Sequence, residues 1–280
     1  MLVIAATLMW PLQEAFGALL MRNHHAAQVV ALRYIAHLLP LGAFVLPRHA
    51  VNVFSTSRPG LQLLRGLCMF GMPAGFMLAI NGAGIGWVWT VFWLMPALAL
   101  VGALLLSERP GPAAWAAALA APLAAAAIRE AVPGSGAGTA AALLMGGSFA
   151  GYVVLSRVLR EEKLAASLFY TAVGALAPMS LFVWQVWTPL VVADIVPALI
   201  TGVLSVLILG AFDLAAESAP VAAFAPLIPL AIVWELLLGV VQHGSPMFTA
   251  DVAGMVLILA STLVFVARHR VQPRIEREVA

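Results

Sequence analysis

Two ionisable residues lie inside apolar stretches on either side of a short polar turn, Arg22-Asn23-His24-His25. Glu14 precedes this turn by about seven residues, and Arg33 follows it at about the same distance. In helices that rise about 1.5 Å per residue, both side chains would lie roughly 10 Å below the same membrane surface. A lone charge in hydrocarbon is costly, so such residues usually face a partner or a wet cavity. The spacing therefore predicts either a structural ion pair or the floor of a binding site.

The two charges differ in what they can do. A glutamate embedded in a membrane can be the counter-charge of a cationic substrate or a proton switch. Arg33 stays charged and can bind a carboxylate through two parallel hydrogen bonds. His37, one turn after Arg33, is a candidate for relaying a proton, with a packed neutral histidine as the alternative. We assign Glu14 and Arg33 to substrate binding, and Glu14 and His37 to proton coupling.

A second acid, Glu235, lies in an apolar stretch of the second half, about six residues from the outer end of its helix. This depth is close to that of Glu14, so we expect Glu235 to complete the same site or to hydrogen-bond to a neighbouring helix. Two acids and one arginine would leave the cavity negative unless one acid is protonated. That balance favours a substrate with an amino or other cationic group, or coupled proton movement.

Aromatic and amide side chains near these charges are further candidates for substrate binding. Trp10 lies one turn before the first of the two acids, and Trp234 directly precedes the second. A tryptophan beside an acid can form a cation–π box for an ammonium group, whereas interfacial belts explain many other membrane tryptophans. Gln13 and Tyr152 complete the predicted set.

Charges nearer the opposite ends of the helices leave alternatives open. Asp213 and Glu217 are compatible with an inner gate and equally with a solvated loop, while Glu108, beside Arg109, is expected to neutralise a helix end. The sequence contains no nucleotide-binding loop, no nucleophile–histidine–acid signature and no metal-ligand motif. We therefore expect no cofactor, no metal and no enzymatic activity, although scattered groups could still form an intramembrane enzyme.

The composition places these residues in a membrane. Of the 280 residues, 63% are hydrophobic and 9% are charged, whereas soluble proteins carry about 25% charged residues. Apolar segments of about 20 residues are long enough to span a hydrocarbon core of about 30 Å, and each should be helical. We place ten of them, at about 1–21, 26–46, 61–80, 86–106, 111–128, 137–157, 164–187, 192–212, 219–241 and 248–267.

Basic residues gather at one end of these spans, which excludes a nucleic-acid face and orients the protein. Only Arg22 and Arg129 lie on the other side, and Arg33 lies within the membrane. The positive-inside rule then predicts a multi-pass protein of the inner (plasma) membrane with both termini cytoplasmic. The cytoplasmic set is Arg48, Arg58, Arg65, Arg109, Arg157, Arg160, Lys163, Arg268, Arg270, Arg274 and Arg277.

A Gly-, Pro- and Ser-containing stretch at 129–137 divides the chain near its middle. We interpret it as a loop that connects a first repeat of five helices, 1–128, to a second, 138–268, with a cytoplasmic tail at 269–280. Pro96 in the fourth span has a counterpart in Pro226 and Pro229 of the ninth. An odd number of spans in each half makes the two repeats inverted, a plan that recurs in transporters with a site at the repeat interface.

The chain resembles the EamA-type transporters of the drug/metabolite transporter superfamily. The resemblance starts at Trp10 and Ala31-Leu32-Arg33-Tyr34. It continues from Leu64-Arg65 through Phe92-Trp93-Leu94-Met95-Pro96 to Leu105-Leu106-Ser107-Glu108-Arg109. Departures from the family pattern are Pro11, Glu14, Ala18 and Val240, the last standing where a second-half counterpart of Glu108 is expected.

The resemblance implies a ten-helix, inverted-repeat carrier of small metabolites, often an exporter. The related small multidrug resistance proteins also use a glutamate in the first helix to exchange protons for cations. We therefore predict alternating-access export of a small zwitterionic or cationic metabolite, such as an amino acid or its derivative. The alternatives are a proton-coupled exporter of cationic drugs or quaternary amines, and a membrane-embedded enzyme or scaffold. The expected partners are the substrate and the bilayer, with the chain as a monomer or homodimer.

Overall fold

A computed structural model describes residues 1–45, 47, 54–244 and 246–279, which form helices and, within these ranges, no strand. Eight helical segments are long and apolar enough to cross a membrane. Two shorter apolar helices, α7 (Pro112–Ile128) and α9 (Leu164–Met179), accompany them. The protein is therefore all-α, with the apolar segments of a multi-pass membrane protein. Arg48 lies outside the described residues, as do the side chains of the predicted tail.

The remaining elements follow one another along the chain. They are α1 (Leu2–Leu20), α2 (Ala26–Pro40) with a π-helical extension (Leu41–Val45), α4 (Pro59–Ala79), α5 (Ile85–Phe92), α6 (Met95–Leu105), α8 (Gly136–Val158), a 3₁₀ turn (Val183–Val186), α10 (Val192–Ser218), α11 (Val221–Phe224), a second 3₁₀ turn, η4 (Ala225–Leu227), α12 (Leu230–His243) and α13 (Thr249–Val279).

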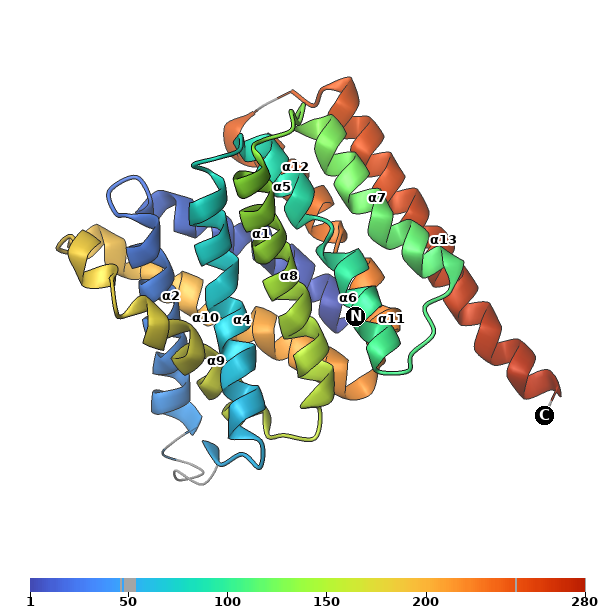
Figure 1. Ribbon diagram of the computed structural model, residues 1–280, viewed down its shortest axis with the longest axis horizontal. Helices are drawn as coiled ribbons and strands as arrows, with labels where there is room; N and C mark the ends of the chain where they lie inside the picture. Colours follow the sequence, from blue (N-terminus) through green and yellow to red (C-terminus); the bar gives the residue numbers. More distant parts are fainter. Residues whose placement is uncertain (46, 48–53, 245, 280) are drawn as a thin grey trace.

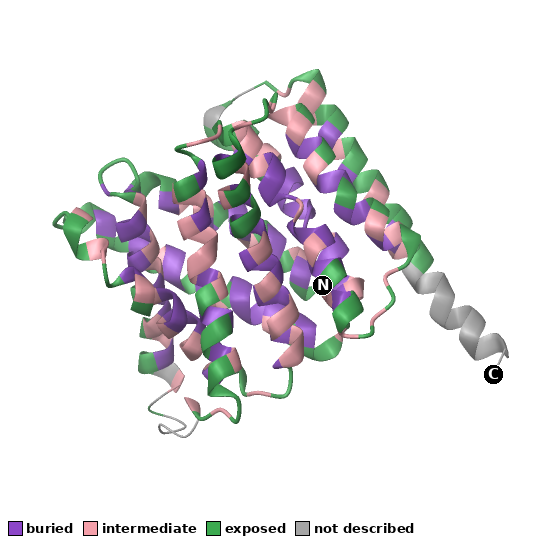
Figure 2. Ribbon diagram, viewed as in Figure 1, coloured by how far each residue is buried: buried purple, intermediate pink, exposed green. Residues whose placement is uncertain are grey.

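The helices form one bundle in which neighbours in space are often distant in sequence (Figure 1). Helix α4 packs against α8 and α9, while α10 packs against α1 and α2. Helices α7 and α13 lie side by side along one edge of the bundle (Figure 1). Buried residues gather in the interior of the bundle, and exposed residues lie along its outer helices (Figure 2). The exposed residues include large apolar side chains such as Leu123 and Leu263. Such a surface suits lipid chains rather than water.

Proline residues interrupt two of the predicted spans. The span expected at 86–106 consists of α5 and α6, which are separated just before Pro96. The span expected at 219–241 consists of α11, η4 and α12, with Pro226 and Pro229 at the interruption. Proline has no amide hydrogen and its ring clashes with the preceding turn, so a continuous helix is broken there.

Two further boundaries differ from the sequence prediction. Helix α9 ends at Met179, directly after Pro178, so the span expected at 164–187 is shorter and finishes with a 3₁₀ turn. Helix α10 continues to Ser218, six residues beyond the predicted end at 212. As a result Asp213, expected at a helix end or in a loop, lies inside a helix.

The connecting segment between the predicted halves is held at both sides. Helix α7 ends at Ile128, and Ser135 caps the next helix by accepting a hydrogen bond from the amide of Gly138 (3.1 Å). The amide of Ser135 donates to the carbonyl of Gly82 in the α4–α5 connection (2.9 Å). The segment thus packs against another loop instead of running free.

Small residues allow the closest approaches between helices. A Cβ added to Gly66 of α4 would lie 2.7 Å from Cα of Gly174 in α9. A Cβ added to Gly202 of α10 would lie 2.7 Å from the backbone nitrogen of His37 in α2, and closer still to Ala36. These distances are shorter than ordinary side-chain contacts, so α4–α9 and α10–α2 can pack as they do only without a side chain at these glycines.

We predict that Gly202→Ala destabilises the protein by about 1–3 kcal/mol, because the new methyl group must push α10 away from α2. The matched control is Gly147→Ala in α8, where an added Cβ meets no atom within 4 Å. The control should be neutral or slightly stabilising, since alanine is the better helix former. Thermal unfolding of the detergent-solubilised protein measures both. A Gly202→Ala variant as stable as the control would contradict the close packing.

Candidate functional site

Glu14 of α1 and Arg33 of α2 form the ion pair that their spacing predicts. Nη2 of Arg33 lies 3.1 Å from Oε1 of Glu14, and the arginine side chain is 17% exposed and the glutamate side chain 38%. The pair therefore lies at the wall of a hollow and not in the closed core. Nε of Arg33 is buried and has no hydrogen-bond partner among the described residues. A ligand could therefore reach the exposed part of the arginine side chain but not this nitrogen.

This pair lines a cavity of about 140 Å³ between α1, α2, α4, α5 and α8. Most of the wall is apolar. It includes five methionines and three aromatic residues, namely Met21, Met69, Met72, Met77, Met145, Tyr34, Phe76 and Trp89. Methionine side chains are flexible and polarisable, so they adapt to ligands of different shape. The cavity combines one anionic and one cationic anchor with an adaptable apolar wall.

Glu235, which the sequence predicted to complete this site, lies elsewhere. Its Oε1 accepts a hydrogen bond from Nη2 of Arg129 at 2.6 Å, and its side chain is 47% exposed. Arg129 comes from the connecting segment and stacks on Trp89, 5.5 Å from the ring centroid. Glu235 is not part of the cavity wall, so it reaches the cavity only indirectly, through Arg129 and Trp89. The geometry does not place two acids and one arginine around one cavity, and the charges of Glu14 and Arg33 balance.

The aromatic and amide side chains that were predicted to bind substrate also make contacts with other parts of the protein. Trp10 is buried among other rings, with its ring centroid 4.9 Å from that of Phe149. Nε1 of Trp234 donates to the hydroxyl of Thr7 (3.3 Å), and Nε2 of Gln13 donates to the carbonyl of Thr201 (2.9 Å). None of these three predicted residues lines the Glu14–Arg33 cavity. Their observed contacts connect helices.

His37 is fully buried, and its Nδ1 lies 3.0 Å from Oγ of Ser205, in a hydrogen bond between α2 and α10. Its Nε2 has no hydrogen-bond partner among the described residues. His37 lies one turn from Arg33 but does not line the cavity. The geometry matches the packed histidine that the sequence left as the alternative.

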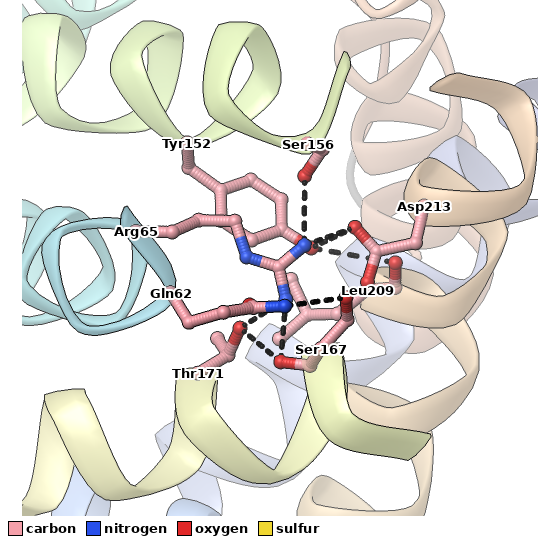
Figure 3. A network of polar contacts seen from close by, with 8 residues as sticks. All are labelled: Gln62, Arg65, Tyr152, Ser156, Ser167, Thr171, Leu209 and Asp213. Carbon is pink, nitrogen blue, oxygen red and sulfur yellow. Dashed lines mark hydrogen bonds and ion pairs between the residues drawn. The ribbon is translucent and has the colours of Figure 1, made fainter. Parts of the chain in front are cut away.

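A larger polar network surrounds Arg65 of α4 (Figure 3). Arg65 is 1% exposed, and its Nη1 donates to Oδ1 of Asp213 (2.7 Å) and to Oγ of Ser156 (3.3 Å). Its Nη2 donates to Oγ1 of Thr171 (2.8 Å) and to the carbonyl of Ser167. One guanidinium therefore joins α4 to α8, α9 and α10.

Tyr152 belongs to this network and not to the cavity, contrary to its predicted role. Its ring packs against the guanidinium of Arg65, 5.3 Å from the ring centroid to Cζ. Its hydroxyl group is 3.3 Å from the carbonyl of Leu209 and 3.4 Å from Oδ1 of Asp213. Gln62 extends the network by donating to the hydroxyl of Ser167 (3.3 Å). The side chains come from α4, α8, α9 and α10 and point toward one another (Figure 3).

This network was not predicted from the sequence, because both of its charges were expected at helix ends. Arg65 was counted among the cytoplasmic cations, but α4 begins at Pro59 and Arg65 lies in its second turn. Asp213 was placed at a helix end, but α10 extends past it. The available signal was that each charge has apolar neighbours on both sides, which is the same signal that identified Glu14 and Arg33.

The network and the cavity lie toward opposite ends of the bundle. On α4, the network residue Arg65 is near the N-terminus, and the cavity residues Met72 and Met77 are nearer the C-terminus. Helix α8 shows the opposite order, because the network residue Ser156 is near its C-terminus and the cavity residue Met145 is nearer its N-terminus. A hollow of only about 20 Å³ remains beside Arg65 and Asp213. This is enough for about one water molecule. Between the helices that carry them, the Glu14–Arg33 level thus has a cavity, whereas the Arg65–Asp213 level is closed by polar contacts.

Comparison with known proteins identifies the fold alone. No protein-family model and no curated protein matches the chain. A solved structure described only as "Crystal structure of protein" aligns with a TM-score of 0.81 over 96% of this chain and 95% of that chain, at 19% sequence identity. Essentially the whole chain therefore shares its architecture with a protein whose sequence has diverged widely.

We predict that Arg65→Met destabilises the protein by about 3–5 kcal/mol, because it leaves the Asp213 carboxylate buried without its cation. The double variant Arg65→Met/Asp213→Leu should recover much of this loss, since no unpaired charge remains. Arg160→Ala, which removes an exposed cation 3.7 Å from Glu161, should cost about 1 kcal/mol or less. Chemical unfolding in detergent gives all three free energies. Equal losses in the single and double variants would argue against a buried ion pair.

Proposed function

We propose that this chain is a secondary transporter of the EamA type that exports small zwitterionic or cationic metabolites by alternating access. The observation that carries the proposal is the Glu14–Arg33 pair in a hollow toward one end of the bundle, combined with the closed Arg65 network toward the other. A carrier needs a polar site that is open to one side while a barrier closes the other side. The arrangement corresponds to the state open toward the outside, if the excess of basic residues marks the cytoplasmic end.

The packing pattern supports two inverted repeats of five crossings. Counting α7 and α9 with the eight long segments gives ten crossings, five on each side of the connecting segment. In the proposed repeats, α1 corresponds to α8, α2 to α9 and α4 to α10. Helix α4 packs against α8 and α9, and its counterpart α10 packs in the same way against their counterparts α1 and α2. The interrupted pair α5–α6 contacts α8, just as the interrupted α11–α12 segment contacts α1 through α12. Such a pattern is expected of a pseudo-two-fold axis in the membrane plane.

The glycine contacts supply a residue-level match between the repeats. Gly66 meets Gly174 where α4 crosses α9, and Gly202 meets Ala36 where α10 crosses α2. The offset in residue number that relates Ala36 to Gly174 also relates Glu14 to Tyr152 and Arg33 to Thr171. Glu14 and Arg33 line the hollow end, whereas Tyr152 and Thr171 bind Arg65 at the closed end. The open cavity and the closed network thus occupy equivalent places in the two repeats.

This correspondence defines the transport cycle that we propose. The helices α1, α2 and α10 form one packed group, and α4, α8 and α9 form the other. The cavity lies between the groups at one end, and the Arg65–Asp213 pair connects them at the other. Rocking of one group against the other would close the cavity and separate Arg65 from Asp213. A substrate held by Glu14 and Arg33 would then face the inner side.

The cavity chemistry supports an amphipathic zwitterion as the substrate. An amino group can bind Glu14, a carboxylate can bind the exposed part of the Arg33 guanidinium, and an apolar side chain can pack against the methionines. The alternative of a quaternary-amine exporter relied on a cage formed by Trp10 and Trp234. Both side chains have other partners, so the geometry favours the zwitterion.

We predict that Glu14→Gln lowers substrate exchange at least tenfold, because it keeps the shape of the side chain but removes the charge that binds the amino group. The protein is reconstituted in proteoliposomes, and exchange is measured with a panel of labelled amino acids and amines. Glu235→Gln is the matched control, since it removes an exposed acid outside the cavity wall. It should retain exchange within about twofold.

Size-exclusion elution and thermal unfolding establish that both variants are folded. If folded Glu14→Gln exchanges substrate as fast as the wild-type protein, the Glu14–Arg33 pair is structural and the proposed site is wrong. If Glu235→Gln is the variant that fails, the site has to be sought around Arg129 and Trp89.

A further inference from the structure

A second cavity, of about 270 Å³, lies at the same end of the bundle as the Arg65 network. It is formed by the α6–α7 connection, the first turn of α7, the start of α11 and the last described side chains of α13. Small residues leave the space open, because Ala113 and Ala114 of α7 and Ala222 and Ala223 of α11 form much of the wall. Phe265 of α13 contributes an apolar side chain. The proposed transport cycle does not use this cavity.

The acid in the wall is already neutralised. Both oxygens of Glu108 accept backbone hydrogen bonds from the start of α11, Oε1 from Val221 (3.1 Å) and Oε2 from Ala222 (2.9 Å). Nε of Arg157 lies 3.7 Å from Oε1 of the same carboxylate. Glu108 therefore stabilises the α6–α11 contact, in keeping with the expectation that it neutralises a helix end. It does not supply a free negative charge to the cavity.

Two arginines in the wall have no such partner. Arg109 and Arg268 both line the cavity and are exposed, and neither has a hydrogen bond or an ion pair with any residue that the structure describes. They approach the cavity from different elements, the α6–α7 connection and α13. A compact space with two unpaired guanidinium groups and a neutralised acid is suited to an anion.

The position of the cavity relative to the membrane indicates which anion. Arg109 lies four residues beyond the end of α6, and Arg268 is the last residue of the apolar stretch Thr249–Arg268. Both therefore lie where the apolar segments end, at the depth of the lipid phosphates. Basic pockets between helices at the cytoplasmic side bind anionic lipid head groups. Guanidinium groups match the geometry of phosphate oxygens through paired hydrogen bonds.

We propose that this cavity binds a phosphate group between Arg109 and Arg268. The phosphate is carried by an anionic phospholipid head group or by a soluble phosphate ester of similar size. Ala222 and Ala223 leave room for the glycerol portion next to the phosphate. The bound group would join the α6–α7 connection to α13 through Arg109 and Arg268.

Thermal unfolding of the full chain in detergent tests this proposal. The additions are phosphatidylglycerol, phosphatidylcholine and glycerol phosphate, each measured separately. The variant Arg109→Gln/Arg268→Gln removes both cations from the cavity. Its charge-matched control is Arg58→Gln/Arg160→Gln, which removes two exposed arginines at the same end but outside this cavity. A third variant, Ala223→Leu, fills the cavity without changing any charge.

We expect phosphatidylglycerol to raise the unfolding temperature of the wild-type protein and of the control by several degrees, and phosphatidylcholine to have no such effect. Both Arg109→Gln/Arg268→Gln and Ala223→Leu should lose the shift. If glycerol phosphate reproduces the shift with the same dependence on the variants, the ligand is a soluble phosphate ester. The Ala223→Leu result still decides the question if the double arginine variant does not fold.

Three results would overturn the proposal. One is an equal shift with phosphatidylglycerol and phosphatidylcholine, which would reflect a general lipid effect. Another is an equal loss in the Arg58→Gln/Arg160→Gln control, which would reflect the overall surface charge. The third is the absence of any shift with either phosphate compound.

Discussion

The ion pair between Arg65 and Asp213 constrains the arrangement of the bundle. A buried arginine and a buried aspartate are each costly to remove from water, and they are tolerated only when they meet with good geometry and additional hydrogen bonds. Arg65 obtains these bonds from α8, α9 and α10, so those three helices must approach α4 at one level. Gly66 makes this approach possible, because the backbone of α9 lies against it where a side chain would otherwise be. The contacts of one guanidinium thus hold four helices together at the level of Arg65.

The helical segments could be predicted from hydropathy, but their ends and interruptions could not. An apolar window detects the part of a helix that lies in hydrocarbon. It does not detect the polar turns beyond, which is why α10 was ended at 212 although its helix continues through Asp213 to Ser218. Prolines were visible in the sequence at Pro96, Pro226 and Pro229. Whether a proline kinks a helix or separates two helices depends on which neighbours satisfy the freed carbonyl groups, and this is a tertiary property.

Within the candidate site, the sequence predicted a contact only where both residues belong to the same helical hairpin. Glu14 and Arg33 belong to one helical hairpin, so equal distance from its turn was enough to bring them together. Glu235 was assigned to the same site from its expected depth, but its partner Arg129 comes from a segment more than a hundred residues away and no periodicity relates them. Trp10 shares a helix face with Glu14, yet neighbouring rings from other helices enclose it. Whether such a side chain faces a cavity or packs in the core depends on its neighbours from other helices. The sequence of one chain does not reveal these neighbours.

The five methionines of the Glu14–Arg33 cavity have a thermodynamic consequence for binding. A methionine side chain loses about 1.5–2 kcal/mol of rotamer entropy when it is immobilised. Met69 and Met145 are already buried, but a ligand that orders Met21, Met72 and Met77 gives up part of its apolar contact energy in this way. A rigid aromatic wall would already be ordered. Such a wall would be expected to accept ligands of different shape and to hold each of them weakly. For the carrier that we propose, weak retention would be an advantage, because a wall that admits a molecule without ordering it tightly does little to delay its release.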